Sequence, residues 1–281
     1  MKKYTNFGDL LSDFRDTYGV SQSDLASWLN VDIRTVQRWE RNDTLLKPEK
    51  EAEMVKVTLL PYQLVRNLNT INPIPTFYDF RLRKYSLSSV EKPLPDAATL
   101  LKNIDLKTER IHTIDIEKEL ETVMLYASVL YGRESVVGKA VLEQAVSLLP
   151  ELNLYLEDEA GFYGGHCLIL PLPNPIYSKL KKREIANKDI KASDLINPKT
   201  GVPTVFYAYS LTADSNTGVL YLVSPLLRFF RDNAFDDYLF ASFTKRHDSV
   251  EINRQLGLKP LWTEQSKNGN KILYEGRFQN L

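Results

Sequence analysis

Residues 19–41 read GVSQSDLASWLNVDIRTVQRWER, and this stretch has the pattern of two short helices joined by a tight turn. Ser21, with Asp24 three residues later, is a variant of the capping box that opens a helix. Gly19 is the expected left-handed stop of the preceding helix. Asn30 tolerates the left-handed backbone conformation and ends the helix opened by Ser21, and Asp32 caps the next one. These signals predict a helix–turn–helix.

Apolar side chains of both helices predict a shared core. Their spacing places Leu25, Trp28 and Leu29 on the inner side of the first helix. Val36 and Trp39 lie on the inner side of the second helix by the same argument.

The opposite face of the second helix carries three arginines. Arg34, Arg38 and Arg41 stand at positions i, i+4 and i+7, within a narrow arc of the helix. In the major groove of DNA, arginine contacts guanine edges, glutamine pairs with adenine, and an aliphatic side chain meets the thymine methyl group. The alternative is a helical bundle whose arginine face is only solvated. The candidate DNA-contacting residues are Gln22, Ile33, Arg34, Thr35, Gln37, Arg38 and Arg41.

The segment from Phe7 to Val57 resembles the lambda-repressor/Cro (XRE-type) family of DNA-binding domains. The matching residues are Phe14-Arg15, Gly19 to Gln22, Asp24 to Ala26, Leu29 to Val31 and Thr35 to Arg41.

The resemblance implies that double-stranded DNA is the partner, with Gln22 on a phosphate. Ile33, Arg34 and Arg38 would then read bases, and Arg15 would pair with Glu40 to brace the motif. Asn42 stands where the family prefers glycine, so the exit turn is expected to differ slightly.

Charge gives no general attraction to DNA. The chain has 36 basic and 36 acidic residues, and residues 1–70 hold 10 of each. A local compensation is expected from Arg66, Arg81, Arg83 and Lys84, which face only Asp79 between residues 59 and 90. Because phosphate attraction is otherwise weak, we expect modest affinity per protomer and therefore a homodimer on a two-fold repeated site.

The sequence indicates a multi-domain chain of the class α + α/β. Residues 1–70 are predicted as an all-α helix–turn–helix domain, and residues 71–104 as a proline-rich basic connector with a short strand or hairpin. Residues 105–281 alternate between helical and strand-like patterns, which predicts a mixed sheet flanked by helices.

The order of elements in 105–281 resembles the GNAT (Gcn5-related N-acetyltransferase) superfamily. The matching segments are 153–165 for its second and third strands, 205–212 for its central fourth strand, and 238–259 for its last strand–helix unit. The resemblance implies acetyl-CoA or another acyl-CoA between two splayed strands, with its pyrophosphate at the start of the following helix. The acyl-CoA-binding residues expected from it are Leu211, Thr212, Gly218 and Val219.

Two departures from the GNAT pattern argue against catalysis. Leu220 places a bulky side chain where the family has a small residue in the pyrophosphate loop. Asn253 stands where the family has its usual general acid, a tyrosine, and an amide cannot deliver a proton at neutral pH. Tyr207 and Tyr209 are possible replacements, although aromatic residues on a central strand are more often core. No catalytic residue is assigned.

Other chemistry is not indicated. Cys167 is a single cysteine, which excludes an intramolecular disulfide, and it is expected to be buried. His112, His166 and His247 are too scattered to predict a metal site, and residues 157–159 are expected to form a solvated turn. Neither a membrane span nor a signal peptide is expected, so the chain is expected to be cytoplasmic.

The main hypothesis is a sequence-specific DNA-binding transcriptional regulator whose GNAT-like domain senses a small molecule, binds a protein effector or dimerises. The first alternative is an acetyl-CoA-dependent N-acetyltransferase with an attached DNA-binding domain. The second is a repressor of the phage or toxin–antitoxin type.

Overall fold

Contacts divide the chain of this computed structural model into two units. The first comprises Met1–Lys92 and Asp158–Gly164, and the second comprises Pro93–Glu157 and Gly165–Leu281. The structure describes residues 1–87, 94–132, 136–233, 238–244, 246–265 and 270–279. Lys92 and Pro93 of the predicted connector lie outside the described residues.

Helices of the N-terminal unit surround one apolar core. They are α1 (Phe7–Tyr18), α2 (Gln22–Trp28), α3 (Ile33–Glu40), α4 (Pro48–Thr58) and α5 (Tyr62–Leu68). The core takes in residues of every helix and also Tyr4 and Tyr78 from strands.

The helix ends have the backbone conformations that the sequence predicts. Gly19 (φ 66°) and Asn30 (φ 50°) are left-handed, and Ser21 forms a capping box with Asp24. Asp32 caps α3 by accepting a hydrogen bond from the Arg34 backbone N–H.

The prediction of an all-α N-terminal domain is wrong. Three antiparallel strands, β1 (Lys2–Tyr4), β2 (Thr76–Asp79) and β3 (Lys84–Ser86), form a sheet in the order β1-β2-β3. The β2–β3 turn is closed by Asp79, whose Oδ1 accepts from the backbone N–H groups of Arg81 and Leu82. The prolines near β2 and β3 disfavour a continuous helix but permit short strands. Because β2 pairs with β1, this part of the expected connector belongs to the N-terminal unit.

The C-terminal unit contains a seven-stranded sheet in the order β4-β5-β6-β7-β8-β10-β9. The strands are β4 (Ile111–Thr113), β5 (Leu154–Glu157), β6 (Tyr163–Pro173), β7 (Thr204–Ala213), β8 (Tyr238–Thr244), β9 (Lys259–Glu264) and β10 (Lys271–Gly276). Strands β7 and β8 run parallel, whereas β6 is antiparallel to β7 and β10 is antiparallel to both β8 and β9. The predicted mixed α/β architecture is present.

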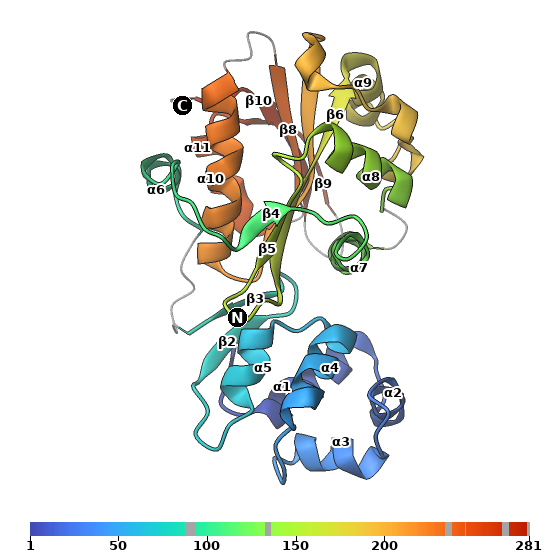
Figure 1. Cartoon of the computed structure of the whole chain (residues 1–281), viewed down its shortest axis with the longest axis vertical. Coiled ribbons are helices and arrows are strands. Elements are labelled where there is room, and N and C mark those ends of the chain that lie inside the picture. Colours follow the sequence, from blue (N-terminus) through green and yellow to red (C-terminus); the bar gives the residue numbers. More distant parts are fainter. Residues whose placement is uncertain (88–93, 133–135, 234–237, 245, 266–269, 280–281) are drawn as a thin grey trace. The chain divides into compact units, whose positions relative to one another are not determined.

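Helices cover both faces of this sheet. They are α6 (Ala97–Lys102), α7 (Leu120–Tyr131), α8 (Lys139–Leu148), α9 (Asn174–Lys181), α10 (Asn216–Asn233) and α11 (Val250–Gln255). Four 3-10 turns are η2 (Asn187–Asp189), η3 (Ala192–Asp194), η4 (Pro198–Thr200) and η5 (His247–Ser249). Figure 1 shows α6, α10 and α11 on one side of the sheet and α7, α8 and α9 on the other. Strands β6 and β7 are therefore buried along nearly their whole length.

Candidate functional site

Helix α3 presents two free arginines. The side chains of Arg34 and Arg38 are exposed and have no hydrogen-bond or ion-pair partner in the described part of the chain. Val36 and Trp39 on the other side of α3 are buried, as predicted. A rigid inner face and free guanidinium groups on the outer face are what reading a DNA groove requires.

Three side chains brace α2 against α3. Glu40 pairs with Arg15, as the family resemblance implies, and it also accepts a hydrogen bond from the Gln22 amide. The Gln37 amide donates to Gln22 Oε1 at 3.2 Å. Two of the predicted DNA contacts, Gln22 and Gln37, are therefore held in place by the same network.

Helix α1 passes very close to the end of α3. A Cβ atom at Gly8 would lie 2.3 Å from the Glu40 carbonyl oxygen and 2.7 Å from that of Trp39. Asn42 is left-handed (φ 57°), so it fills the place of the family's glycine, and its Oδ1 accepts from the Gly8 backbone N–H. The sequence does not reveal the role of Gly8, because a close approach between helices leaves no periodic signal.

The remaining predicted DNA contacts, Ile33, Thr35 and Arg41, differ in how exposed their side chains are and in whether they already have a partner. Ile33 is 40% exposed and Thr35 is half-buried. Arg41 is exposed but lies 3.5 Å from the Asp43 carboxylate. Trp28, which was predicted to be on the inner side of its helix, is 49% exposed, because the seven residues of α2 bury mainly Leu25 and Ala26.

Only part of the expected basic patch that follows α4 is exposed. Arg83 is 5% exposed and Lys84 3% exposed, and the Arg83 guanidinium donates to the backbone carbonyls of Thr58 and Leu59. Arg66 is paired with the buried Glu51 at 3.0 Å. Arg83 satisfies a helix end and Arg66 a buried acid, whereas Arg81 is exposed, so the compensation available at the surface is smaller than the count of four basic residues suggests.

In the C-terminal unit, the first candidate site is a cavity of about 90 Å³ beside the parallel strands β7 and β8. The pairing of these strands ends at Ala208 and Ser242, and both residues line the cavity. Three of the four predicted acyl-CoA contacts also line it, namely Leu211, Thr212 and Val219.

Gly218 is not among the lining residues and has a packing role. A Cβ atom there would lie 2.8 Å from Cβ of Ala213 and 3.1 Å from Leu156 Cδ2. Its backbone N–H donates to Ser215 Oγ at 3.2 Å, so one of the donors expected to hold a pyrophosphate is already occupied. Leu220 packs against the apolar core of this unit.

Arg246 is a cavity residue that the sequence analysis missed. Its side chain is 12% exposed, it pairs with Asp248 at 2.9 Å, and its Nη1 donates to Thr212 Oγ1 at 3.2 Å. It lies in the short segment between β8 and η5, where neither helical nor strand periodicity marks it.

A buried chain of hydrogen bonds leads to the same cavity. His166 Nε2 lies 2.7 Å from Ser210 Oγ, which donates to the Tyr131 hydroxyl at 3.3 Å, and Tyr131 lines the cavity. Desolvation by burial lowers the pKa of His166 to about 3, so this imidazole is neutral near pH 7.

The two candidate proton donors, Tyr207 and Tyr209, and Asn253 at the usual acid position each have another hydrogen-bond partner. The Tyr207 hydroxyl donates to Asn187 Oδ1 at 2.9 Å, and burial raises its pKa above the ordinary value. Burial also raises the pKa of Tyr209 to about 12, and its hydroxyl accepts from the Val137 backbone N–H. Asn253 lines the cavity and donates its amide to the Ser249 carbonyl.

Tyr207 lines a second, larger cavity of about 450 Å³, together with residues of α9 and β9. Tyr207, one of the two tyrosines that the sequence offers as a replacement acid, therefore lines a different cavity from the predicted acyl-CoA contacts.

Two further residues differ in their outcome. Cys167 is fully buried, as predicted, and burial raises the pKa of its thiol to about 12. Asp158 was predicted to lie in a solvated turn, but it is 8% exposed, and its Oδ1 accepts from the backbone N–H groups of Ala160 and Phe162. The loop 158–162 is closed by hydrogen bonds to the Asp158 carboxylate, which is therefore buried. The acidic sequence of residues 157–159 alone does not distinguish such an acceptor from a solvated side chain.

Comparisons with known proteins assign no family to the chain. No family model matches it, and no curated protein matches it. Among solved structures, a Drosophila melanogaster polyamine N-acetyltransferase is 13% identical over 60% of this chain and 99% of its own, with a TM-score of 0.37. An arylalkylamine N-acetyltransferase from Aedes aegypti is 15% identical over 60% of this chain and 98% of its own, again with a TM-score of 0.37. A structure titled as a putative phosphinothricin N-acetyltransferase is 14% identical over 61% of this chain and 98% of its own, with a TM-score of 0.37.

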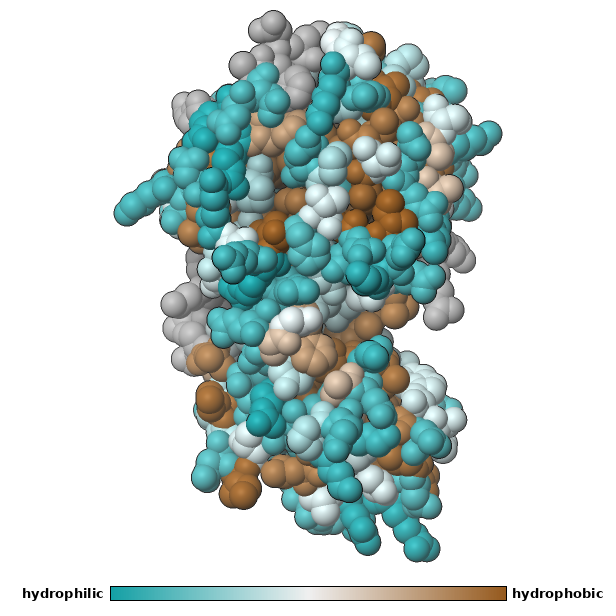
Figure 2. Space-filling view, viewed as in Figure 1, coloured by the Kyte–Doolittle hydropathy of each residue, from teal (hydrophilic) through white to brown (hydrophobic). Residues whose placement is uncertain are grey.

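Among the described residues, no helix is both long enough and apolar enough to cross a membrane. On the face drawn in Figure 2, hydrophilic residues predominate and hydrophobic residues are scattered among them.

Proposed function

We propose that this chain binds double-stranded DNA in a sequence-dependent manner through α2 and α3, and that it acts as a transcriptional regulator. The observation that carries the proposal is the pair Arg34 and Arg38, one helical turn apart, exposed, and without a partner in the described residues. Each can form the bidentate hydrogen bonds with guanine that discriminate between base pairs.

The contacts that hold α3 in place favour sequence-specific binding of DNA over non-specific binding. The Arg15–Glu40–Gln22 network and the close approach at Gly8 hold α3 in one orientation. With a net charge of zero, the chain attracts phosphates only weakly, so affinity has to come from specific contacts.

The test begins with selection of preferred sequences from a random duplex library by the intact chain. Binding of the selected duplex and of scrambled duplexes is then measured by fluorescence anisotropy for Arg34→Ala, Arg38→Ala and Gln22→Ala. We expect each arginine variant to lose about 10- to 100-fold on the selected duplex and little on scrambled ones, because a good base contact contributes about 1–3 kcal/mol. Gln22→Ala should weaken all duplexes similarly.

Arg254→Ala is the matched control, because this arginine is exposed in α11, outside the N-terminal unit. Failure to enrich any sequence, or equal effects of Arg34→Ala and Arg254→Ala, would contradict the proposal.

A second candidate function is binding of acyl-CoA in the C-terminal unit, as a sensor or for N-acetyl transfer. The observation that favours it is the cavity at the end of the β7–β8 pairing, lined by Leu211, Thr212 and Val219 and carrying the buried cation Arg246. Asn253, which stands where the GNAT family has its general acid and donates its amide to the Ser249 carbonyl, favours sensing over catalysis.

Thermal unfolding of the intact chain with acetyl-CoA, CoA and, as a control, ATP tests this second function. Ligand at 100 times its Kd stabilises by about 2.7 kcal/mol, which shifts the melting temperature by degrees. A shift with acetyl-CoA or CoA but not with ATP supports the cavity as an acyl-CoA site. The absence of a shift at millimolar ligand would contradict it, and would leave an interaction domain of the regulator.

A further inference from the structure

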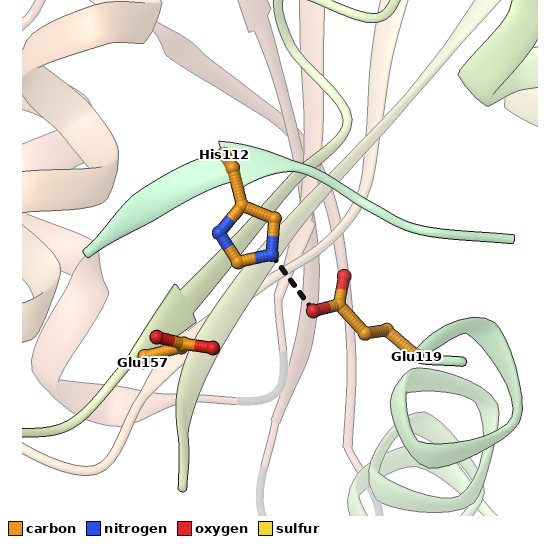
Figure 3. A group of neighbouring side chains, drawn as sticks. All are labelled: His112, Glu119 and Glu157. Atoms are coloured by element: carbon orange, nitrogen blue, oxygen red, sulfur yellow. Dashed lines mark hydrogen bonds and ion pairs between the residues drawn. The ribbon is translucent and has the colours of Figure 1, made fainter. Parts of the chain in front are cut away.

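Three side chains from separate segments of the C-terminal unit meet at one point. His112 lies on β4, Glu157 ends β5, and Glu119 is the residue at which α7 begins. One ligand atom from each lies within 4.8 Å of the others, and Figure 3 shows the imidazole and both carboxylates turned toward one another.

The β4–β5 ladder fixes two of these residues on one face of the sheet. His112 stands opposite Tyr155 in the antiparallel register, and their rings lie 5.6 Å apart. Glu157 follows two residues later on the same strand, so its side chain shares the face of Tyr155 and His112.

A turn fixes the third residue. The Glu119 backbone N–H donates to the Asp115 carbonyl, and Glu119 Oε2 accepts from the Asp115 backbone N–H at 2.8 Å. Its other oxygen, Oε1, lies 2.7 Å from His112 Nε2. A carboxylate oriented by a backbone N–H in this way resembles the ligands of metal sites, whose direction is set by outer hydrogen bonds.

The charge of the cluster is unbalanced compared with its neighbourhood. In the described residues, neither Glu119 nor Glu157 is paired with lysine or arginine, whereas Asp115 pairs with Lys118 and Glu121 pairs with Lys139 nearby. The side chains are half-buried, with His112 39% and Glu119 15% exposed, so ions from solvent can reach them.

We propose that His112, Glu119 and Glu157 bind one divalent transition-metal ion of the Zn²⁺ type. One imidazole nitrogen and two carboxylate oxygens suit Zn²⁺ or Co²⁺ better than Ca²⁺ or Mg²⁺, which prefer oxygen ligands alone. Ligands about 2.0–2.2 Å from a common ion lie at most about 4.4 Å apart. Binding would therefore draw in any pair of ligand atoms that now lies up to 4.8 Å apart, and would move Glu119 Oε1 away from its 2.7 Å contact with His112 Nε2. Water fills the remaining coordination position.

The ion would join β4, β5 and the start of α7 at one point, next to the β4–β5 ladder and the Asp115–Glu119 turn. It would replace the His112–Glu119 hydrogen bond and neutralise the two carboxylates. We therefore infer a structural role for the ion within the C-terminal unit, independent of both proposed functions.

The experiment titrates the intact, tag-free and metal-free chain with Co²⁺, followed by visible absorption, and with Zn²⁺, followed by calorimetry. We expect one equivalent to bind. Glu157→Gln and His112→Asn remove a ligand each, and each should weaken binding at least tenfold, since even outer-shell changes cost about 10- to 100-fold.

Glu117→Gln and His247→Asn are matched controls, because they make the same chemical changes at residues outside the cluster. Both should retain the affinity of the unaltered chain. Glu157→Gln is the decisive variant, since no hydrogen bond of its side chain to the described residues is lost. The absence of a one-to-one complex, or equal affinities of Glu157→Gln and Glu117→Gln, would overturn the proposal.

Discussion

At the scale of single residues, several buried polar side chains have an identifiable hydrogen-bonding role. Arg83 satisfies the carbonyl groups at the end of α4, Glu51 holds Arg66 and Asn69, and His166 meets Ser210 inside the second unit. A buried polar group without such a partner would cost free energy, so burial and partner come together.

The first prediction concerns the pH dependence of stability through His166. Its pKa is about 3 in the folded chain and 6.5 without burial, so below pH 6.5 the unfolded chain takes up a proton that the folded chain does not. This contribution to stability is complete above pH 6.5 and is lost as the pH falls toward 3, with a slope of about 1.4 kcal/mol per pH unit.

Chemical unfolding of the C-terminal unit between pH 7 and 4 measures this effect. Acidic side chains titrate in the same range, so the comparison is between the unaltered chain and His166→Gln, which should show a smaller loss of stability toward acid. His247→Gln is the control and should follow the unaltered chain. Parallel pH profiles of all three would show that His166 is not held neutral by burial.

Residue identities could be predicted from the sequence where local chemistry decides them. Gly19, Ser21, Asn30 and Asp32 carry their cap function within a few neighbouring residues, and all four have the predicted role. Arg246 could not be predicted, because its partners are set by tertiary folding: Thr212 is 34 residues away, and the cavity it lines is built from several elements.

At the scale of elements, the close packing of neighbouring helices and strands explains two glycines whose role the sequence does not show. Gly218 was expected to let a cofactor approach the backbone, but the atoms that approach it are Ala213 and Leu156 of β7 and β5. Gly8 allows α1 to pass against the end of α3 in the same way. The strand and helix order of the second unit was predictable from periodicity, whereas these contacts between elements were not.

The second prediction is that Gly218→Ala destabilises the C-terminal unit by about 1–3 kcal/mol, because the added methyl group overpacks the junction of α10 with β7. Gly138→Ala is the control: nothing lies within 4 Å of a Cβ atom there, and the change should stay within about 0.5 kcal/mol. Unfolding midpoints in urea measure both. Equal midpoints would show that α10 lies farther from β7 than described.

At the scale of the whole molecule, charge is the property that most restricts function. The chain is neutral, and of the basic residues expected to compensate, Arg83 and Lys84 are buried and Arg66 is paired with Glu51. A single pair of free arginines on α3 gives limited affinity, so the proposed regulator needs two copies on one duplex to bind tightly.

The third prediction is therefore cooperative binding to paired half-sites. Two copies of the selected sequence, placed about 34–36 Å apart along the duplex, should bind two chains more tightly than two independent sites would. Inserting about half a helical turn between the copies should remove the cooperativity, because the second site then faces away. Mobility-shift titrations measure both duplexes, and identical curves would indicate binding as a monomer.

The position of β10 has a consequence for how the chain matures on the ribosome. This strand follows β9 in sequence but lies inside the sheet, between β8 and β9. During translation, β8 and β9 are synthesised before β10, the strand that pairs with both, so the edges that β10 covers stay unpaired until it is made. The nascent sheet is consequently most open to association with other nascent chains in the interval before Lys271–Gly276 leaves the exit tunnel.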